Sequence, residues 1–331
     1  MKFSRITAVV FSLILLFLLP SCQSSNESKN DIYKPVTVFG VTFTSAPTAV
    51  VSLSPYTTEM MLQLGLSDQL SACTDDCVLP KNSKIVSVGD GSEPDFDTVL
   101  AVKPDLLLSQ RSLSKADLDR LNQAGIKALI IPPAEDLREL ESYYSALAAV
   151  FYGEEKGIGK AESTINPLVR AANVLRDELK NERKNVTFIY YLTLGKSVAT
   201  ADTFAGDLLS CLGENKAEGK DGHIDFAKAK ESNPTYLFVS KPYALENLQS
   251  SPDWNTFSSV ANRKVLSFDS SLFERRSPDL AEFLIETAKT IYPDKADEID
   301  QAYKASVTEY PTDNDESSSA SPSAEQSQSV S

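Results

Sequence analysis

The side chains most often used in catalysis are sparse in this sequence. It contains one histidine, His223, in a loop of glycine and charged residues. It has no Gly-x-Ser-x-Gly turn and no His-Glu-x-x-His segment, so the signatures of a serine hydrolase and of a zinc metalloprotease are both missing. One histidine also cannot supply the several ligands that sites for a bare transition-metal ion use. We therefore predict a binding protein rather than an enzyme, with no cofactor and no metal site.

Four cysteines are the other side chains with distinctive chemistry: Cys22, Cys73, Cys77 and Cys211. Cys73 and Cys77 belong to the segment Cys-Thr-Asp-Asp-Cys. A zinc site is disfavoured there, because no second pair of cysteines exists to complete a tetrahedral set. Two interpretations stay open for this pair, a local disulfide and two partly buried thiols that flank a loop.

The first cysteine closes a segment with the features of a secretory signal peptide. Two cations near the start precede a largely apolar run at residues 8–19, and Leu-Pro-Ser leads to Cys22. That run is shorter than the roughly 20 residues of a membrane-spanning helix. Leu-Pro-Ser-Cys resembles the lipobox of bacterial lipoproteins, whose cysteine is acylated. We expect residues 1–21 to be removed and palmitate-type acyl chains on Cys22 to anchor the protein to the extracytoplasmic face of the cell membrane. A plain secretory signal is the alternative.

Charge and composition bound the possible partners. The formal net charge of -14 becomes about -16 when the two signal-peptide cations are removed. Such a charge argues against nucleic acid as a partner, and against a highly anionic ligand unless local cations attract it. Residues 22–34 have the composition of a flexible tether, and the Ser-rich, acidic residues 311–331 that of a disordered tail.

Strand-like and helix-like patterns alternate along the remaining residues. Strands are predicted at 50–53, 70–73, 85–88, 106–108, 128–131, 186–192, 236–239 and 265–268. Helices are predicted from about residue 57, at 96–102, 115–125 and 204–212, and at 281–292 as the last element. This alternation indicates βαβ units and mostly parallel sheets.

One segment lacks strands. From Ile158 to Leu179 the apolar residues fall three or four apart, which predicts a single helix of about 25 residues, with Pro167 as a point of kinking. We therefore expect an N-terminal α/β lobe at 35–153, a linker helix at 154–184 and a C-terminal α/β lobe at 185–310.

An internal repeat supports two equivalent lobes. Asp95 and Phe96 precede Pro104 and an apolar strand, and the same arrangement recurs 130 residues later with Asp225, Phe226 and Pro234. An Asp N-cap, a short helix, a terminating proline and a buried strand form one unit used twice.

Several motifs, taken together and in order, resemble the ABC-transporter substrate-binding proteins of the cobalamin and ferric-siderophore type. They are Ser-Leu-Ser-Pro-Tyr-Thr-Thr-Glu at 52–59, Thr-Asp-Asp-Cys-Val-Leu-Pro at 74–80, Asp-Phe-Asp at 95–97, Ala-Val-Lys-Pro-Asp-Leu at 101–106 and Phe-Glu-Arg-Arg-Ser-Pro at 273–278. The resemblance covers about residues 50–292. It implies two α/β lobes joined by one long helix, with a ligand cleft between the lobes and a permease with its ATPase as partners.

The resemblance also implies which residues meet the ligand, since in this family the loops at the carboxyl ends of the strands line the cleft. These loops carry Tyr56, Asp76, Arg111, Tyr191, Lys241, Tyr243, Phe273, Arg275 and Arg276. The aromatic rings suit the flat faces of a macrocycle, and the cations suit its amides or carboxylates. For each aromatic ring, as for Trp254, a place in the core is the alternative.

An acidic residue on each lobe of these proteins faces arginines of the permease. Asp97 matches the first-lobe position, whereas the second-lobe position holds Ala227, a departure from the family pattern. Asp225 is the nearby substitute, and asymmetric docking is the alternative. An ordinary first-turn acid, favoured by the helix dipole, is the other interpretation of Asp97.

The ligand is narrowed to three classes. A corrinoid fits the Phe-Glu-Arg-Arg-Ser-Pro segment best, and a ferric siderophore would use the four cations Arg111, Lys241, Arg275 and Arg276. Haem is least favoured, because the methionines other than Met1 lie on an apolar helix face. A lipoprotein scaffold that binds other proteins is the alternative from a different class.

Overall fold

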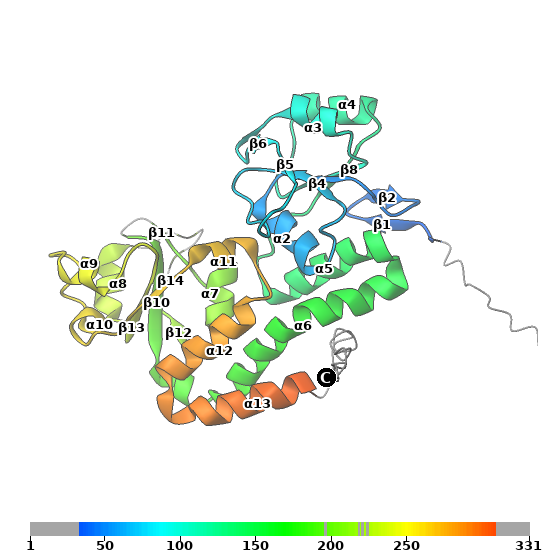
Figure 1. Ribbon diagram of the computed structural model, residues 1–331. Coiled ribbons are helices and arrows are strands. Elements are labelled where there is room, and N and C mark those ends of the chain that lie inside the picture. The colour runs from blue at the N-terminus through cyan, green and yellow to red at the C-terminus, as the bar shows by residue number, and fades with distance from the viewer. Residues whose placement is uncertain (1–32, 195–196, 218, 220–221, 223–224, 309–331) are drawn as a thin grey trace, which may run out of the picture. The chain divides into compact units, whose positions relative to one another are not determined.

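The computed structural model describes residues 33–308, except 195–196, 218, 220–221 and 223–224 (Figure 1). The expected signal peptide, the acylated Cys22, most of the tether, the C-terminal tail and His223 lie outside the described residues. All of the elements described below belong to one compact unit that begins at Lys34.

The first half of this unit is built on a five-stranded parallel sheet with the order β5-β4-β3-β8-β9. Two antiparallel hairpins, β1-β2 and β6-β7, accompany it. The elements are β1 (Val36–Val38), β2 (Val41–Phe43), β3 (Val50–Ser52), α2 (Pro55–Gln63), β4 (Leu70–Cys73), β5 (Val86–Ser87), β6 (Gly89–Asp90), β7 (Glu93–Pro94), α3 (Phe96–Val102), β8 (Leu106–Ser109), α4 (Lys115–Gln123), β9 (Lys127–Ile130) and α5 (Leu137–Tyr152).

The central strands of this sheet are covered on both faces. Every residue of β3 and β8 is buried, which explains why these strands are continuous apolar runs rather than alternating patterns. The chain then turns directly from β3 into α2, because the Ser54 hydroxyl accepts a hydrogen bond from the Thr57 amide (3.2 Å) and Pro55 suits the first helical turn. This turn places the start of α2 at the carboxyl edge of the sheet.

The second half contains a sheet with the order β11-β10-β13-β14, and β12 also pairs with β10. Its pairs are parallel except β10 with β11. The elements are η2 (Glu182–Asn185), β10 (Thr187–Thr193), β11 (Ser197–Val198), α7 (Phe204–Leu209), β12 (Glu214–Asn215), α8 (Phe226–Ser232), β13 (Tyr236–Ser240), α9 (Leu245–Gln249), α10 (Ser258–Ala261), β14 (Val265–Phe268), α11 (Ser270–Arg275), α12 (Leu280–Ile291), η3 (Pro293–Lys295) and α13 (Ala296–Thr308). The predicted fold class, two α/β lobes with mostly parallel sheets, is confirmed.

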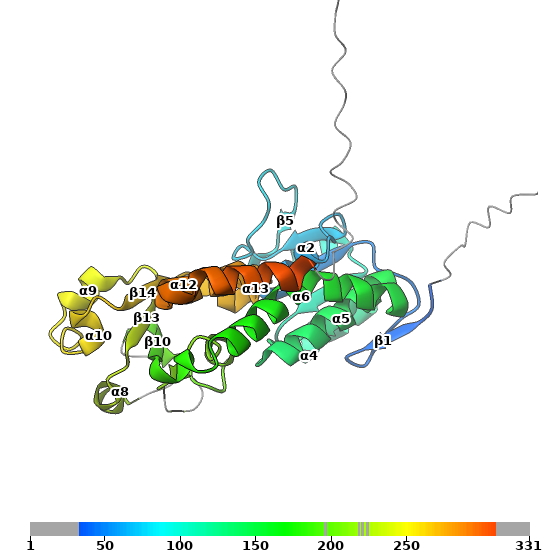
Figure 2. The same cartoon turned by 90° about the horizontal axis from the view of Figure 1, so that it is seen from below.

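A 25-residue helix, α6 (Glu154–Glu178), connects the two halves, with Pro167 inside it. Its buried face is made of small and aliphatic residues at helical spacing, among them Ala161, Ile165 and Leu168. This face packs against α5, α12 and α13, and Figures 1 and 2 both show α12 and α13 beside α6. The long helix predicted from the apolar spacing is thus present.

Two glycines of α6 should respond oppositely to alanine. A Cβ on Gly157 would lie 2.7 Å from the backbone of Ala149 in α5, whereas a Cβ on Gly159 would meet nothing within 4 Å. Gly157→Ala is therefore expected to cost about 1–3 kcal/mol through overpacking. Gly159→Ala should stabilise the protein by about 0.5–1 kcal/mol, because alanine has the higher helix propensity. Urea unfolding of both variants measures the difference, and equal effects would disprove the close approach of the helices.

The internal repeat corresponds to two matching units. The Asp95 carboxylate caps α3 by accepting from the Asp97 amide (3.0 Å), and Asp225 caps α8 by accepting from the Ala227 amide (2.8 Å). Both helices end in a left-handed residue, Lys103 with φ 53° and Asn233 with φ 43°. A buried proline and a buried strand follow in each case. The repeat predicted from the sequence is confirmed down to its caps.

Two helices differ from the sequence prediction. The helix expected to be the last element, α12, is followed by α13, in which Ile299 is the one buried residue, so its apolar stripe is too thin to recognise. The sequence patterns also predict no element over 137–152, where the structure has α5. Over the described ranges, none of the helices is both long enough and apolar enough to cross a bilayer.

Candidate ligand-binding site

The loops after β4 and β8 bring two predicted site residues together around Gly91. The Arg111 guanidinium donates a hydrogen bond to the Gly91 carbonyl oxygen. The Asp76 carboxylate lies so close that a Cβ on Gly91 would be 2.9 Å from its Oδ2. A cavity of about 240 Å³ opens beside them, lined by Leu53 and Ser109 among others. Asp76 and Arg111 are both exposed, as a ligand-binding role requires.

We call the loops that carry Asp76, Gly91 and Arg111 the first-lobe rim. Local hydrogen bonds hold this rim in place. The Ser109 hydroxyl donates to the Arg111 carbonyl oxygen (2.7 Å) and accepts from the Arg111 amide (3.1 Å). Hydrogen bonds from the Ser92 hydroxyl and amide lower the pKa of Asp90, so this carboxylate stays ionised at neutral pH. With Asp76 nearby, the rim is acidic apart from Arg111.

We call the loop after β13, which carries Lys241 and Tyr243, the second-lobe rim. Lys241 is exposed, and its amide donates to the carbonyl oxygen of Phe268 at the end of β14 (2.8 Å). Tyr243 is half-buried against the core, and its carbonyl oxygen accepts from the Ser267 hydroxyl (2.6 Å). The carboxyl ends of two neighbouring strands thereby fix the loop that carries Lys241 and Tyr243, the location expected for ligand contacts in an open α/β sheet.

Three further predicted residues belong instead to a buried polar contact between α2 and the segment after α11. Its acceptor is Glu59, which is 7% exposed. The Ser277 hydroxyl donates to Glu59 Oε1 at 2.6 Å, and the Gln63 amide donates to the same oxygen at 2.9 Å. Arg275 Nε lies 3.3 Å from Glu59 Oε2, an ion pair by distance without hydrogen-bond alignment. We call this set, with Tyr56, Ala134 and Arg276, the α2–α11 contact.

Arg276 completes the α2–α11 contact. Its Nε donates to the Ala134 carbonyl oxygen at 2.7 Å. Its guanidinium lies over the ring of Tyr56 at 5.3 Å and over the ring of Phe204 at 5.2 Å. Burial lowers the pKa of Arg276, and burial raises the pKa of Tyr56 against the opposing effect of the guanidinium. In this conformation Arg275 pairs with Glu59, and Arg276 contacts the Ala134 carbonyl oxygen and the ring of Tyr56. All three predicted ligand contacts are therefore occupied by contacts within the protein.

Two predicted aromatic contacts are core residues in this structure. Tyr191 is fully buried on β10, edge-on to Trp254 with ring centroids 4.6 Å apart. Phe273 is 5% exposed and lies against Tyr190 and Phe283. Trp254 is 6% exposed and stacks on Phe257, so it too belongs to the core. We therefore no longer assign Tyr191 and Phe273 to ligand contact.

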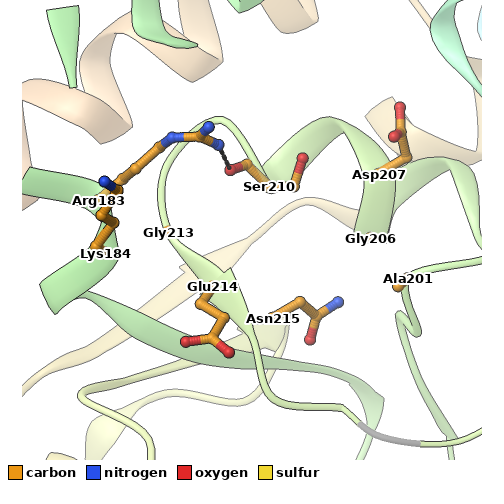
Figure 3. Close-up of a pocket in the computed structure, with 9 residues that line it drawn as sticks. All are labelled: Arg183, Lys184, Ala201, Gly206, Asp207, Ser210, Gly213, Glu214 and Asn215. Atoms are coloured by element: carbon orange, nitrogen blue, oxygen red, sulfur yellow. Dashed lines mark hydrogen bonds between the residues drawn. The ribbon is translucent and has the colours of Figure 1, made fainter. Parts of the chain in front are cut away.

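A larger cavity, of about 410 Å³, lies at the opposite edge of the second sheet (Figure 3). Two cations, Arg183 and Lys184, and two acids, Asp207 and Glu214, are among its lining residues. Arg183 Nη1 donates to the Ser210 carbonyl oxygen at 3.2 Å. Because this cavity adjoins the amino ends of β10 and β12, it lies away from the edge where parallel sheets bind ligands.

The two predicted docking acids differ in their surroundings. The Asp97 side chain is 89% exposed and pairs with Arg120. The Asp225 carboxylate is exposed but is the N-cap of α8, as Asp95 is the N-cap of α3 in the first lobe. At the position equivalent to Asp97, Ala227 is exposed. The sequence departure at Ala227 is therefore a real difference between the two surfaces.

Sequence reasoning missed the centre of the α2–α11 contact. Glu59 belongs to a family motif, but the sequence analysis predicts no contact for it, and none for Ser277 or Ala134. One signal was present: a carboxylate directly before Met60 and Met61, which are 0% exposed, needs a polar partner if it is buried. Within the described ranges no group of three His, Cys, Asp or Glu side chains is placed to hold a metal ion.

The fold is that of a two-lobed α/β protein whose candidate site lies on loops at the carboxyl ends of two sheets. Residues 50–272 match the periplasmic binding protein family, so the chain belongs to that family.

Individual relatives agree with this assignment. The chain is 27% identical to an uncharacterized ABC transporter substrate-binding lipoprotein of Bacillus subtilis over 291 residues, 82% of this chain and 90% of that protein. It is 29% identical to the vitamin B12-binding protein of Yersinia pestis over 169 residues, 50% of this chain and 59% of that protein. The solved structure of a periplasmic haem-binding protein from Roseiflexus matches with a TM-score of 0.60 at 16% identity, over 80% of this chain and 100% of that one.

Proposed function

We propose that this protein, anchored by lipid at Cys22 on the extracytoplasmic face of the membrane, captures a corrinoid of the cobalamin type and delivers it to an ABC permease. In this proposal residues 35–153 and 185–310 are the two lobes, residues 154–184 link them, and the ligand lies between the rims that carry Asp76, Arg111, Lys241 and Tyr243. The similarity to the vitamin B12-binding protein of Yersinia supports the ligand class.

The observation that carries the choice of ligand is the pairing of the arginines. Of the four cations that a ferric siderophore would need, Arg275 pairs with Glu59, and Arg276 binds the Ala134 carbonyl oxygen between two rings. One exposed cation is left on each rim, Arg111 and Lys241, beside several carboxylates. This balance suits a ligand with polar amides and little net charge better than a multiply anionic chelate.

A ferric siderophore is the second candidate. Arg111 and Lys241 are both exposed, one on each rim, and such a pair can meet opposite sides of one anionic chelate. This candidate requires that the two cations overcome the surrounding carboxylates, so it predicts binding that weakens strongly with salt.

Delivery requires docking of the permease on both lobes. We propose that Asp97 is the first-lobe contact, because its carboxylate is exposed at the surface beside Arg120. Asp225 is the proposed second-lobe contact, and because it also caps α8, docking on that lobe is expected to be the weaker of the two.

A thermal-shift screen tests the ligand. Cyanocobalamin and cobinamide, each at about 100 times its dissociation constant, should raise the free energy of unfolding by about 2.7 kcal/mol. The screen includes a ferric hydroxamate, a ferric catecholate and haem. If a ferric chelate raises the midpoint while both corrinoids leave it unmoved, the corrinoid proposal is wrong.

A pair of variants separates the two ligand classes further. The double variant Arg111→Ala with Lys241→Ala should keep most of the corrinoid shift and lose nearly all of a siderophore shift. Lys304→Ala is the matched control, because its side chain is 76% exposed on α13, outside both rims. A corrinoid shift that disappears in the double variant would contradict the proposed ligand chemistry.

A further inference from the structure

The loop after β4 holds two thiols in contact. Cys73 is the last residue of β4 and is 2% exposed, while Cys77 is partly exposed at the end of a turn closed by its amide and the Thr74 carbonyl oxygen (3.1 Å). The two thiols are close enough for each to shift the pKa of the other. Neither is in a disulfide, so both cysteines are reduced.

Two hydroxyl groups are hydrogen-bonded to the Cys77 sulfur. They are Thr58 Oγ1 at 3.1 Å and Thr74 Oγ1 at 3.4 Å, and either atom of each pair can be the donor. A sulfur with several donors directed at it is stabilised as the thiolate, which is the nucleophilic form of cysteine. Both hydroxyls can donate to a Cys77 thiolate, so the geometry favours Cys77 as the anion of the pair.

The ionisation of the two thiols follows this geometry. The Cys73 hydrogen bond, helped by Thr58 and Thr74, lowers the pKa of Cys77 to about 7, although burial and the charge of Asp76 oppose it. The hydrogen bond to Cys77 and burial raise the pKa of Cys73, and the charges of Asp76 and Asp75 add to that effect. Cys77 is therefore half ionised near neutral pH while Cys73 remains a thiol.

The third described cysteine provides an internal comparison. Cys211 is 0% exposed, and burial raises its pKa to about 12. It should be inert toward polar reagents under native conditions. Differences in reactivity between Cys77 and Cys211 can thus be measured within one molecule.

From this geometry we propose that Cys77 is a reactive thiolate that closes a reversible disulfide with Cys73 by exchange with a low-molecular-weight disulfide. The Cys77 thiolate attacks one sulfur of the small disulfide, which forms a mixed disulfide and releases one small thiolate. That thiolate takes the Cys73 proton. The Cys73 thiolate then attacks Cys77 Sγ and releases the second small thiol as its thiolate, which takes a proton from water. The cysteine pair loses two electrons, and the small disulfide gains them.

Formation of this disulfide would change the surroundings of two functional elements. Cys77 would give up its contact with Thr58 in α2, the helix that carries Glu59. The loop between the two cysteines carries Asp75 and Asp76, and Asp76 belongs to the first-lobe rim. The oxidation state of the pair is therefore expected to be felt at both places, although the proposal itself does not depend on which ligand binds.

Peptide mass spectrometry tests the disulfide directly. The full chain in detergent is incubated with oxidised glutathione at pH 7.5 and quenched with acid, and free thiols are then blocked with N-ethylmaleimide. A Cys73–Cys77 disulfide with blocked Cys211 is the expected product. Recovery of Cys73 and Cys77 in the blocked form, to the same extent as Cys211, would overturn the proposal.

The pH dependence of alkylation tests the thiolate. Site-resolved iodoacetamide labelling of Cys77 should reach half its maximal rate near pH 7, where an ordinary thiol with a pKa of about 8.5 is only about 3% ionised. The rate at pH 7 should exceed that of an ordinary exposed thiol only about threefold, because nucleophilicity falls with pKa. It should exceed that of Cys211 at least about tenfold. A midpoint at or above pH 8.5 would contradict the assignment of Cys77 as a thiolate near neutral pH.

Three variants separate a reactive pair from an accidental contact. Cys73→Ser should trap glutathione on Cys77 as a stable mixed disulfide, because the resolving thiol is gone, whereas Cys77→Ser should leave Cys73 unmodified. Thr58→Val, which keeps the side-chain shape, should move the alkylation midpoint of Cys77 upward. Cys211→Ser should change neither result. An unchanged midpoint in Thr58→Val, or glutathione on Cys73 in Cys77→Ser, would contradict the proposal.

Discussion

Replacing Glu59 by alanine should lower the free energy of unfolding by about 3–5 kcal/mol, because one partner of a buried ion pair is removed. The Glu59 and Arg275 side chains are 8% and 12% exposed, so the arginine left behind cannot recover its hydration. Ser277 and Gln63 lose their acceptor at the same time. Urea unfolding followed by circular dichroism measures the loss.

Two controls make the Glu59 result specific. Asp97→Ala breaks a surface ion pair whose carboxylate side chain is 89% exposed, and it should change stability little. The double variant Glu59→Ala with Arg275→Met should be less destabilised than Glu59→Ala alone, because the unpaired buried charge is gone. If Glu59→Ala costs no more than Asp97→Ala, the α2–α11 contact does not hold the two elements together.

Replacing Trp254 by alanine is the second large expected effect, a loss of about 3–5 kcal/mol. The indole stacks on Phe257 with ring planes 20° apart, and it lies edge-on to Tyr191 and Phe226 at centroid distances of 4.6 and 5.0 Å. Truncation removes contacts on several sides and leaves a cavity in the second-lobe core. Because Trp254 is the only tryptophan, unfolding of the variant must be followed by circular dichroism.

Trp254→Phe is the matched control for this site. A phenyl ring keeps much of the stacking on Phe257, so it should lose less than half as much stability as the alanine variant. If Trp254 were instead the wall of an open pocket, truncation would cost little stability and would mainly weaken ligand binding. That outcome would reverse the placement of Trp254 and Tyr191 in the core.

The parts of the fold that could be predicted are those with local causes. Buried parallel strands are continuous apolar runs, and an Asp N-cap nine residues before a proline marks a short helix, so β8, β13, α3 and α8 were recognisable. By contrast, α13 buries only Ile299 completely. Its apolar pattern is set by the surface of α6 on which it lies, which sequence spacing alone does not reveal.

The candidate site also has a part that the sequence predicts and a part that it does not. Loops at the carboxyl ends of strands follow from the order of strands and helices, so topology predicts the positions of Asp76, Arg111, Lys241 and Tyr243 at the sheet edges, and their contact with a ligand stays a prediction. The partners of an arginine do not follow from topology. Ser277 is 218 residues from Glu59 along the chain, and nothing near either residue indicates the other. Tyr190 and Tyr191 point to opposite faces of β10, and both are 0% exposed because both faces are covered, so Tyr191 lies in the core.

Equilibrium dialysis of the full chain against cyanocobalamin tests the central claim most directly. The account predicts saturable binding of one corrinoid per chain, retained at high salt and in the Arg111→Ala with Lys241→Ala variant. Saturable binding of a ferric chelate in place of the corrinoid would correct the ligand class while keeping the transport function. Absence of saturable binding for corrinoids, ferric chelates and haem alike, by a chain that unfolds cooperatively, would contradict the proposed capture of a corrinoid and its siderophore alternative together.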